Sequence, residues 1–433
     1  MPKVEDKSDS KGWSRAELLV LVHAAIWFFL LLFGYYVLRP IREQISSTYG
    51  IQNLTWLFWA SFSVMLITVP LYSVLVGKFD RRILVPSIYA LFVTCLLMFW
   101  AAMKYLPDES QIWVARVLYV WVSVYGLFIV SFFWSVVGDL LSTSQGRRIF
   151  GYIAGGGTIG GLVGSQVALH LVNRIGVANL LLIPAGLLVL AYVVYLMLER
   201  SLAQYGFGTG TVAGKATGGN PFAGFTSVFK SRYLLMICCY GVFLAVCGTT
   251  VYFQQAEIVN AAIDTEEGRT AYFAGVNFAV SLVALVFQFG LVGWLMKRVG
   301  LGWTLAGLPL AYIVGISSLA ISPTIEVLAV IAVLGRSAEY GIANPAREVL
   351  FTSVNREDRY KAKSFIDTVV RRGGDTMIGT IYRTLRDSFE LAMVAMSWLV
   401  LPLAIAWAGL ALFIGKENHR ITVDAATSDT ESA

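Results

Sequence analysis

Long apolar runs follow one another along the chain, and they constrain its fold more than any other feature. A helix that crosses a bilayer needs about 20 mostly apolar residues, and only helices and closed barrels satisfy their backbone inside lipid. Of the 433 residues, 57% are hydrophobic and only 14% are charged. The sequence therefore predicts an all-α integral membrane protein with about twelve transmembrane helices, near residues 17–40, 54–77, 83–105, 112–137, 149–173, 177–198, 233–258, 271–296, 301–322, 326–351, 363–385 and 391–414.

A segment rich in Gly, Thr and Ala, residues 199–225, divides these runs into two halves and is typical of a flexible linker. At an offset of about 214 residues, VLRPIRE (37–43) aligns with VYFQQAE (251–257), and basic turns recur at matching places. Two six-helix halves in parallel repeat form the architecture of a major facilitator transporter, with a cavity between the halves. We expect a tail at 1–16, an N-terminal bundle at 17–198, a linker at 199–232, a C-terminal bundle at 233–414 and a tail at 415–433.

The basic residues are distributed unevenly between the predicted loops. With a cytoplasmic N-terminus, the non-cytoplasmic loops hold only Lys104, Arg174, Arg269, Arg383 and Arg386, whereas most other basic residues face the cytoplasm. This positive-inside bias predicts a multi-pass protein of the cell inner (plasma) membrane with both termini in the cytoplasm. It also accounts for the net charge of +6 without a nucleic-acid partner. We expect the lipid bilayer and a small substrate as partners, and a monomer.

Other features exclude several classes of site. The four cysteines lie within spans at spacings that do not suit a metal, and they read as packing residues. In GYIAGGGTIGGLVGS (151–165), Gly156, Gly160 and Gly164 repeat every fourth residue, which indicates close helix packing rather than a phosphate loop. The sequence shows no nucleophile with a matching base, so we expect no enzyme activity, no cofactor and no metal.

Charged residues cluster inside the last spans. Such residues cost roughly 2.5 to 3.5 kcal/mol each on insertion scales, so they usually face a cavity or one another. Arg336 and Arg371 both fall near half depth by the helical rise. Asp367, Arg371 and Asp375 recur at a spacing of four, which places them on one helix face. The complete set comprises Arg336, Glu339, Arg347 and Glu348 in 326–351, and Asp367, Arg371, Arg372 and Asp375 in 363–385.

An excess of arginine over acid favours an anion, because the planar guanidinium binds phosphate or carboxylate through two hydrogen bonds. Candidate substrate-binding residues are Arg39, Arg42, Arg336, Arg347, Arg371 and Arg372. The alternative is a set of internal salt bridges that only fix helix orientation, with Arg336 paired to Glu339 and Arg371 paired to Asp367 and Asp375.

The stretch GYYVLRPIREQ (34–44) places Arg39 and Arg42 at the non-cytoplasmic end of the first span, against the charge bias. They would either line the outer half of the cavity or reach back to water as interfacial anchors. Pro40 is expected to break or kink the helix. Glu43 and its repeat counterpart Glu257 are candidates for gate salt bridges. The other gating or coupling candidates are Asp139, Glu339 and Asp375.

Three segments carry a family resemblance. Residues 132–165 (FFWSVVGDLLSTSQGRRIFGYIAGGGTIGGLVGS), residues 344–375 (NPAREVLFTSVNREDRYKAKSFIDTVVRRGGD) and LRPIREQ (38–44) resemble the ATP/ADP antiporter family, and above all its free-living bacterial relatives. The resemblance implies exchange of nucleotides, typically ATP against ADP, by alternating access without ATP hydrolysis. Arg42 and Glu43 stand where the family has a functional Lys and Asp, and Glu257 stands near a functional acid of helix seven. Arg in place of Lys keeps the charge but changes the hydrogen-bond geometry.

The sequence leaves three functions open. The first is a secondary transporter that exchanges nucleotides or a similar phosphorylated anion. The second is a proton-coupled transporter of another organic solute on the same fold, in which Glu43, Glu257, Glu339 or Asp375 would carry the proton. The third is a non-transport role as a membrane sensor or assembly protein, in which the charges only hold the bundle together.

Overall fold

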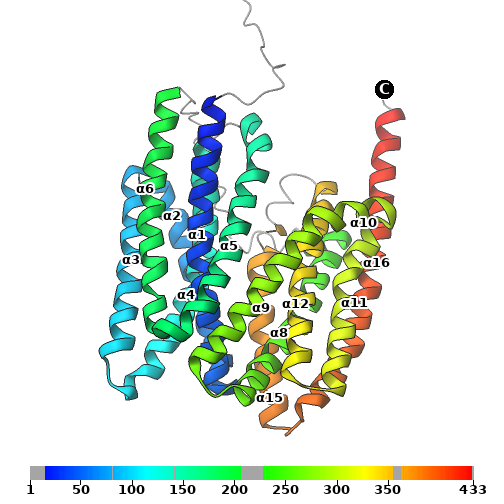
Figure 1. Cartoon of the computed structure of the whole chain (residues 1–433). Helices are drawn as coiled ribbons and strands as arrows, with labels where there is room; N and C mark the ends of the chain where they lie inside the picture. The colour runs from blue at the N-terminus through cyan, green and yellow to red at the C-terminus, as the bar shows by residue number, and fades with distance from the viewer. Residues whose placement is uncertain are drawn as a thin grey trace, which may run out of the picture.

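The computed structural model describes residues 15–79, 81–140, 143–205, 228–229, 231–354, 362–363 and 365–431 and is almost entirely helical over them. One bundle contains α1 (Arg15–Thr48), α2 (Gly50–Lys78), α3 (Arg81–Tyr105), α4 (Asp108–Leu140), α5 (Thr143–Leu180) and α6 (Leu182–Tyr205). The other contains α8 (Arg232–Ala262), α9 (Glu266–Val286), α10 (Val292–Arg298), α11 (Gly300–Ile321), α12 (Ile325–Ala338), α13 (Asn344–Leu350), α15 (Arg371–Asp387) and α16 (Met393–Glu431). The start of α1 and the end of α16 lie at the same end of the molecule (Figure 1).

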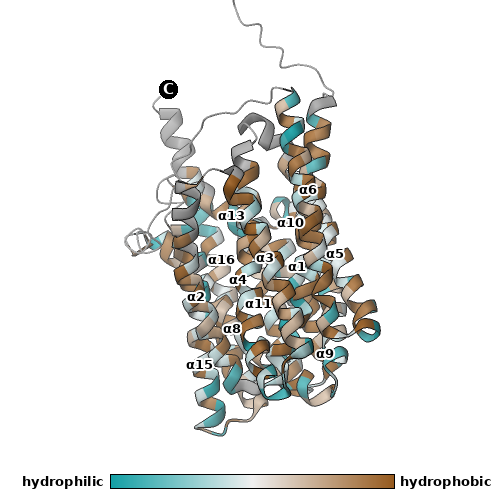
Figure 2. Cartoon of the chain, turned by 90° about the vertical axis from the view of Figure 1, so that its left-hand side faces the viewer, coloured by the Kyte–Doolittle hydropathy of each residue, from teal (hydrophilic) through white to brown (hydrophobic). Residues whose placement is uncertain are grey.

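Three short π-helical segments complete the transmembrane passes of the second bundle. Segment η1 (Phe287–Leu291) joins α9 to α10, η2 (Glu339–Ala343) joins α12 to α13, and η4 (Ile366–Val370) precedes α15. Each merged helix corresponds to one predicted span. Eight of the described helices are long and apolar enough to cross a membrane, and Figure 2 shows hydrophobic residues along the helices with hydrophilic ones toward their ends. The predicted all-α membrane fold with two bundles is confirmed.

The structure corrects several predicted helix ends. The first helix does not break at Pro40, because α1 continues through this residue to Thr48. This extension adds two turns and keeps Glu43 in the same helix as Arg39. A separate turn occurs between the fifth and sixth predicted spans. There the backbone of α5 changes direction at Gly176, whose φ of 78° lies in the left-handed region that glycine tolerates. The predicted tail from 415 is helical, since α16 extends to Glu431. The middle of the predicted linker, 206–227, lies outside the described residues, so its boundaries stay a prediction.

The glycine stripe packs α5 directly against the backbone of α1. A Cβ at Gly156, Gly160 or Gly164 would lie under 3.0 Å from the carbonyl oxygen of Ala25, Phe29 or Phe33, respectively. Small residues at this spacing let two helix backbones approach closely. The packing interpretation of this run is therefore confirmed. The tight contact fixes the position of α1, which carries Arg39, Arg42 and Glu43.

The two bundles meet at the end of the molecule where α1 ends. There Trp59 Nε1 donates to Thr380 Oγ1 (2.9 Å), and Arg269 Nη1 donates to Thr48 Oγ1 (3.0 Å). Figure 1 shows the helices of the two bundles lying close at the lower end of the view and diverging toward the end that holds both termini. The contacts between the bundles thus close one side of the protein.

We predict that Gly160→Ala destabilises the protein, because the added methyl group would collide with the backbone of α1. Overpacking of this kind costs about 1–3 kcal/mol. The matched control is Gly155→Ala on the same helix, where a Cβ would meet nothing within 4 Å. Thermal unfolding of the purified protein in detergent measures both variants. Equal melting temperatures for the two would contradict the packing described here.

Candidate functional site

A cavity of about 190 Å³ lies between the two bundles and is lined by residues of both. Its wall contains the two helix-one arginines and three arginines of the second bundle, together with two carboxylates and several tyrosines. The charged lining residues are Arg39 and Arg42 of α1, Arg336 of α12, Arg371, Arg372 and Asp375 of α15, and Glu339 of η2. The structure therefore brings most of the predicted charged residues together in one place.

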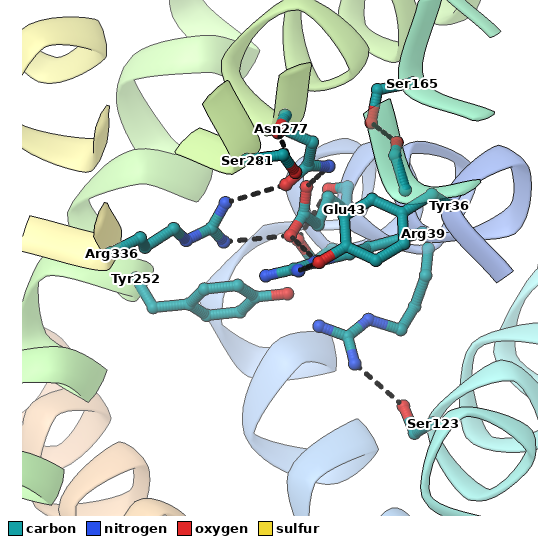
Figure 3. A network of polar contacts seen from close by, with 12 residues as sticks. Tyr36, Arg39, Glu43, Ser123, Ser165, Tyr252, Asn277, Ser281 and Arg336 are labelled. Carbon is teal, nitrogen blue, oxygen red and sulfur yellow. Dashed lines mark hydrogen bonds and ion pairs between the residues drawn. The ribbon is translucent and has the colours of Figure 1, made fainter. Parts of the chain in front are cut away.

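Glu43 sits beside this cavity and links the bundles. Its carboxylate is completely buried and pairs with Arg39 Nε (3.3 Å) one turn earlier on α1. It also accepts from Arg336 Nη2 (2.8 Å) and from Asn277 Nδ2 (2.9 Å), both on the opposite bundle. Figure 3 shows these groups converging on the carboxylate. One buried acid of the first bundle is thus held by a cation and an amide of the second.

Neutral groups complete this network. Asn277 accepts from Arg336 Nη1 (3.3 Å) through its Oδ1, so its amide bridges the arginine and the glutamate. Arg39 Nη2 donates to the hydroxyl of Tyr340 (3.0 Å), again across the two bundles. Because buried charges are stable only when their hydrogen-bonding capacity is met, these contacts satisfy the buried carboxylate of Glu43. We call this set, Arg39, Glu43, Asn277, Arg336 and Tyr340, the cross-bundle latch.

The ion pairs of the second bundle differ from those that sequence spacing suggested. Arg371 pairs with Glu339, and Arg336 pairs with Glu43. Asp367 does not pair with Arg371. It lies in η4, where the π-helical turn holds one extra residue, so a spacing of four no longer places two side chains on one face. Asp367 pairs instead with Arg347 Nη2 (2.8 Å).

Two of the cavity arginines have no carboxylate partner. Arg42 and Arg372 make no ion pair within 4.0 Å among the residues the structure describes. Arg42 reaches the hydroxyl of Ser123 (3.5 Å), and its guanidinium lies 5.5 Å from the ring centroid of Tyr119. Its Nε is buried without a hydrogen-bond partner. With Glu43 counted, five guanidinium groups face three carboxylates, which leaves two positive charges in excess.

Asp375 is the acid of the cavity without an ion pair in the described part of the chain. It accepts a hydrogen bond from Thr249 Oγ1 (3.0 Å) on α8. Arg371, one turn earlier on α15, is bound to Glu339 instead. Asp375 thus faces the cavity with a neutral hydroxyl as its hydrogen-bond partner, three residues after Arg372 on the same helix.

Other predicted site residues lie elsewhere. Arg347 does not line the cavity and is occupied by Asp367. Glu257 accepts from the Tyr382 hydroxyl (2.8 Å) and pairs with Arg386 Nη2 (2.6 Å), so its contacts stay inside the second bundle. The side chain of Asp139 lies outside the described ones.

Sequence reasoning missed the neutral members of the site. Asn277 is buried at the centre of an apolar run, and a lone amide inside a span was the available signal, because it needs partners there. Tyr340, Tyr119 and Ser123 gave no such signal, since their residue types are common in helices of this kind. Their positions follow only from how the two bundles face each other.

Comparison with known proteins gives a family and a fold. The profile of the Major Facilitator Superfamily matches residues 24–370. A bacterial homologue of the human lysosomal transporter Spinster, in an inward-facing and unoccupied conformation, has a TM-score of 0.56 and 15% identity, covering 94% of this chain and 99% of its own. A variant of the nucleoside transporter NupG has a TM-score of 0.56 and 13% identity, covering 94% and 100%. At these identities the likeness concerns the fold alone. No curated protein matches the sequence.

We predict that Glu43→Gln loosens the closed end of the protein. The substitution leaves Arg39 and Arg336 buried without a carboxylate, and breaking a buried pair in this way costs about 3–5 kcal/mol. Because this ion pair joins the two bundles, its loss destabilises the closed arrangement relative to an open one. The readout is the labelling rate of Ser281→Cys by a membrane-impermeant maleimide, in a protein whose four native cysteines are replaced. Ser281 is buried beside the latch (Figure 3), and we expect its labelling to rise at least about tenfold.

Glu257→Gln is the matched control, since it removes an ion pair that lies within one bundle. Labelling of Ser281→Cys should stay at the wild-type rate in this variant. An equal increase in both variants would show that Glu43 has no special role in holding the bundles together.

Proposed function

Because the chain belongs to the Major Facilitator Superfamily, we propose that it exchanges nucleotides, or a similar phosphorylated anion, across the membrane by alternating access. The family makes it a multi-pass membrane transporter rather than an enzyme. Both bundles and the whole cavity belong to one chain, which suits a transporter that works as a monomer. The charge of the cavity is the observation that carries the choice of substrate.

The two unpaired arginines support an anionic substrate. Ionisable residues within transmembrane passes usually face a cavity or an opposite charge, and both Arg42, which is half-buried, and Arg372, which is exposed, line this cavity. Within the described residues, the internal salt bridges account for Arg39, Arg336 and Arg371, but leave Arg42 and Arg372 without a carboxylate. Guanidinium groups suit a phosphate or a carboxylate, since they donate two parallel hydrogen bonds to its oxygens. The resemblance of three segments to the ATP/ADP antiporter family favours a nucleotide within this class.

Exchange follows from the same charge surplus. An empty cavity would have to carry two uncompensated positive charges through the change between its two orientations. A bound phosphate removes this penalty. The change between the two orientations therefore has its lowest energy cost when an anion is bound, in either direction of transport. Such a transporter exchanges one anion for another instead of returning empty.

The latch connects the cavity to the closed end. Arg39 and Arg336 line the cavity and also pair with Glu43. A bound anion therefore competes with Glu43 for the hydrogen-bond donors that join the two bundles. The present cavity of about 190 Å³ is smaller than the roughly 300–1,000 Å³ of typical ligand pockets. The helices must therefore move apart around an organic substrate. With both termini in the cytoplasm, as the charge bias predicts, the closed end is the outer one.

We predict that Arg42→Gln and Arg372→Gln each weaken binding of nucleotide by about tenfold to a hundredfold. Each removes charge-assisted hydrogen bonds worth about 1.5–3 kcal/mol. Neither substitution breaks an ion pair of the described chain, and the melting temperature without ligand separates loss of stability from loss of binding. Arg383→Gln is the control, because Arg383 lies on the exposed side of α15 in a pair with Asp387. Binding is measured as stabilisation of the purified protein by ADP, ATP, phosphorylated sugars and carboxylates, which reaches about 2.7 kcal/mol at a hundredfold excess over the dissociation constant.

If no soluble anion stabilises the wild-type protein, the anion site is wrong and a non-transport role gains support. If both arginine variants bind anions as tightly as the wild type does, these two residues lie outside the site.

Proton-coupled transport is the second candidate, and Asp375 favours it. This acid faces the cavity without an ion pair in the described chain, which makes it the candidate proton carrier of this alternative. Counterflow in proteoliposomes separates the two functions. We expect uptake of labelled nucleotide to require unlabelled nucleotide inside the vesicles and to ignore an imposed pH gradient. Uptake into empty vesicles driven by a pH gradient would instead assign the chain to the proton-coupled class.

A further inference from the structure

A small side pocket lies beside the main cavity within the second bundle, between α8, α11 and α12. Its volume is about 40 Å³. It shares Gly248, Tyr252, Tyr312 and Arg336 with the main cavity, so the two spaces are adjacent. Beyond these residues its wall is aliphatic, except for the amide of Gln255. Arg336 is therefore the boundary between the charged cavity and a neutral extension.

Gln255 is the unexplained polar group of this pocket. Its side chain is 3% exposed and makes no hydrogen bond with any residue the structure describes. The preceding Gln254 is a useful contrast. Its Nε2 donates to Ser397 Oγ (2.8 Å) and to the Met393 carbonyl (3.2 Å), which gives the nitrogen end of that amide a structural role, while its buried Oε1 has no partner in the described chain. Buried polar groups in proteins nearly always have a partner, so the amide of Gln255 points to a group that is not part of the protein.

Tyr312 supplies a second polar atom to the same space. Its side chain is 7% exposed, and within the described chain its hydroxyl makes no hydrogen bond. Glycines keep the approach to it open: a Cβ at Gly248 would lie 3.5 Å from this hydroxyl, and one at Gly335 would lie 3.8 Å from the ring. A hydroxyl and an amide thus face one space from two different helices.

The size and charge of the pocket limit what it can hold. One ordered water needs about 10–15 Å³ on this measure of volume, so about 40 Å³ accommodates a hydroxyl or amide group but not a ring system. The pocket contains no carboxylate, and its single cation lies at the entrance. An amide and a hydroxyl can both donate and accept, which suits a neutral hydrogen-bonding group.

We propose that the side pocket is a specificity subsite, in which Gln255 and Tyr312 hydrogen-bond a neutral hydroxyl group of the substrate while the arginines bind its phosphate. This inference rests on the proposed function and narrows it. The substrate is then a hydroxylated organic phosphate, in which a sugar hydroxyl and the anionic group lie on either side of Arg336. Inorganic phosphate and pyrophosphate would occupy the arginines and leave the subsite empty.

The test compares organic with inorganic anions on the purified full chain. The probes are ADP with pyrophosphate, and glucose 6-phosphate with orthophosphate, each measured by titration calorimetry. Gln255→Leu keeps the side-chain size and removes the amide. In whichever pair the wild type binds, we expect Gln255→Leu to weaken binding of the organic anion, ADP or glucose 6-phosphate, by about tenfold or more. A site built to hydrogen-bond a substrate hydroxyl loses affinity when the protein partner of that hydroxyl is removed. Affinity for the inorganic member should stay unchanged.

A second variant, Gly335→Ala, keeps the test valid if Gln255→Leu does not fold. Gly335→Ala places a methyl group in the side pocket at an ordinary contact distance, and alanine favours the helix. It should produce the same selective loss. Gly409→Ala, where a Cβ would meet nothing within 4 Å, is the matched control and should bind both anions as the wild type does.

The remaining outcomes overturn the inference in distinguishable ways. The subsite is wrong, while the arginine site stands, if the wild type binds organic and inorganic anions with equal affinity. The same holds if Gln255→Leu and Gly335→Ala both lose affinity for organic and inorganic anions alike, or if both keep affinity for the two classes. If the wild type binds none of the four probes, the proposed function fails and the subsite fails with it.

Discussion

The carboxylate of Glu43, wholly buried between guanidinium groups of opposite bundles, is the interaction on which the rest of the site depends. A charge in this position is stable only because Arg39, Arg336 and Asn277 all direct donors at it. Removing Glu43 would leave both arginines without their carboxylate in a low-dielectric interior, where unpaired ions are most costly. The latch therefore behaves as a unit. It also ties the closure of one end of the protein to the state of two arginines that face the cavity.

The membrane fold could be predicted because its signals are local. Apolar runs locate the passes, and the glycine stripe of α5 predicts a close helix contact whose partner the structure identifies as α1. The charged residues of the cavity could likewise be selected, since few ionisable groups occur inside spans. Their pairing could not. It depends on the π-turns η2 and η4, which shift one face of a helix relative to its neighbour, and on how two separate bundles meet.

Glu43 and Glu257 show the same limit in another form. The internal repeat relates them, yet Glu43 crosses to the opposite bundle while Glu257 binds Tyr382 and Arg386 of its own bundle. Pro40 predicts a break or a kink in the first helix, but α1 continues through it to Thr48 without a break, since neighbouring helices can satisfy the freed backbone group. Sequence symmetry thus locates equivalent residues without fixing equivalent contacts. Only the three-dimensional arrangement separates the two roles.

The charge surplus also bears on which anion can drive the transporter. To shift the balance between two conformations, a substrate must bind one of them better by an amount comparable to the cost of opening the latch. That cost is about 3–5 kcal/mol for a buried ion pair, and a charge-assisted hydrogen bond contributes about 1.5–3 kcal/mol. Two or three such bonds therefore offset the latch. A terminal phosphate supplies three strong acceptor oxygens and carries a charge of about −1.5 to −2, which matches the two excess guanidinium groups. A single carboxylate has two oxygens and one charge, and it would leave one of Arg42 and Arg372 uncompensated.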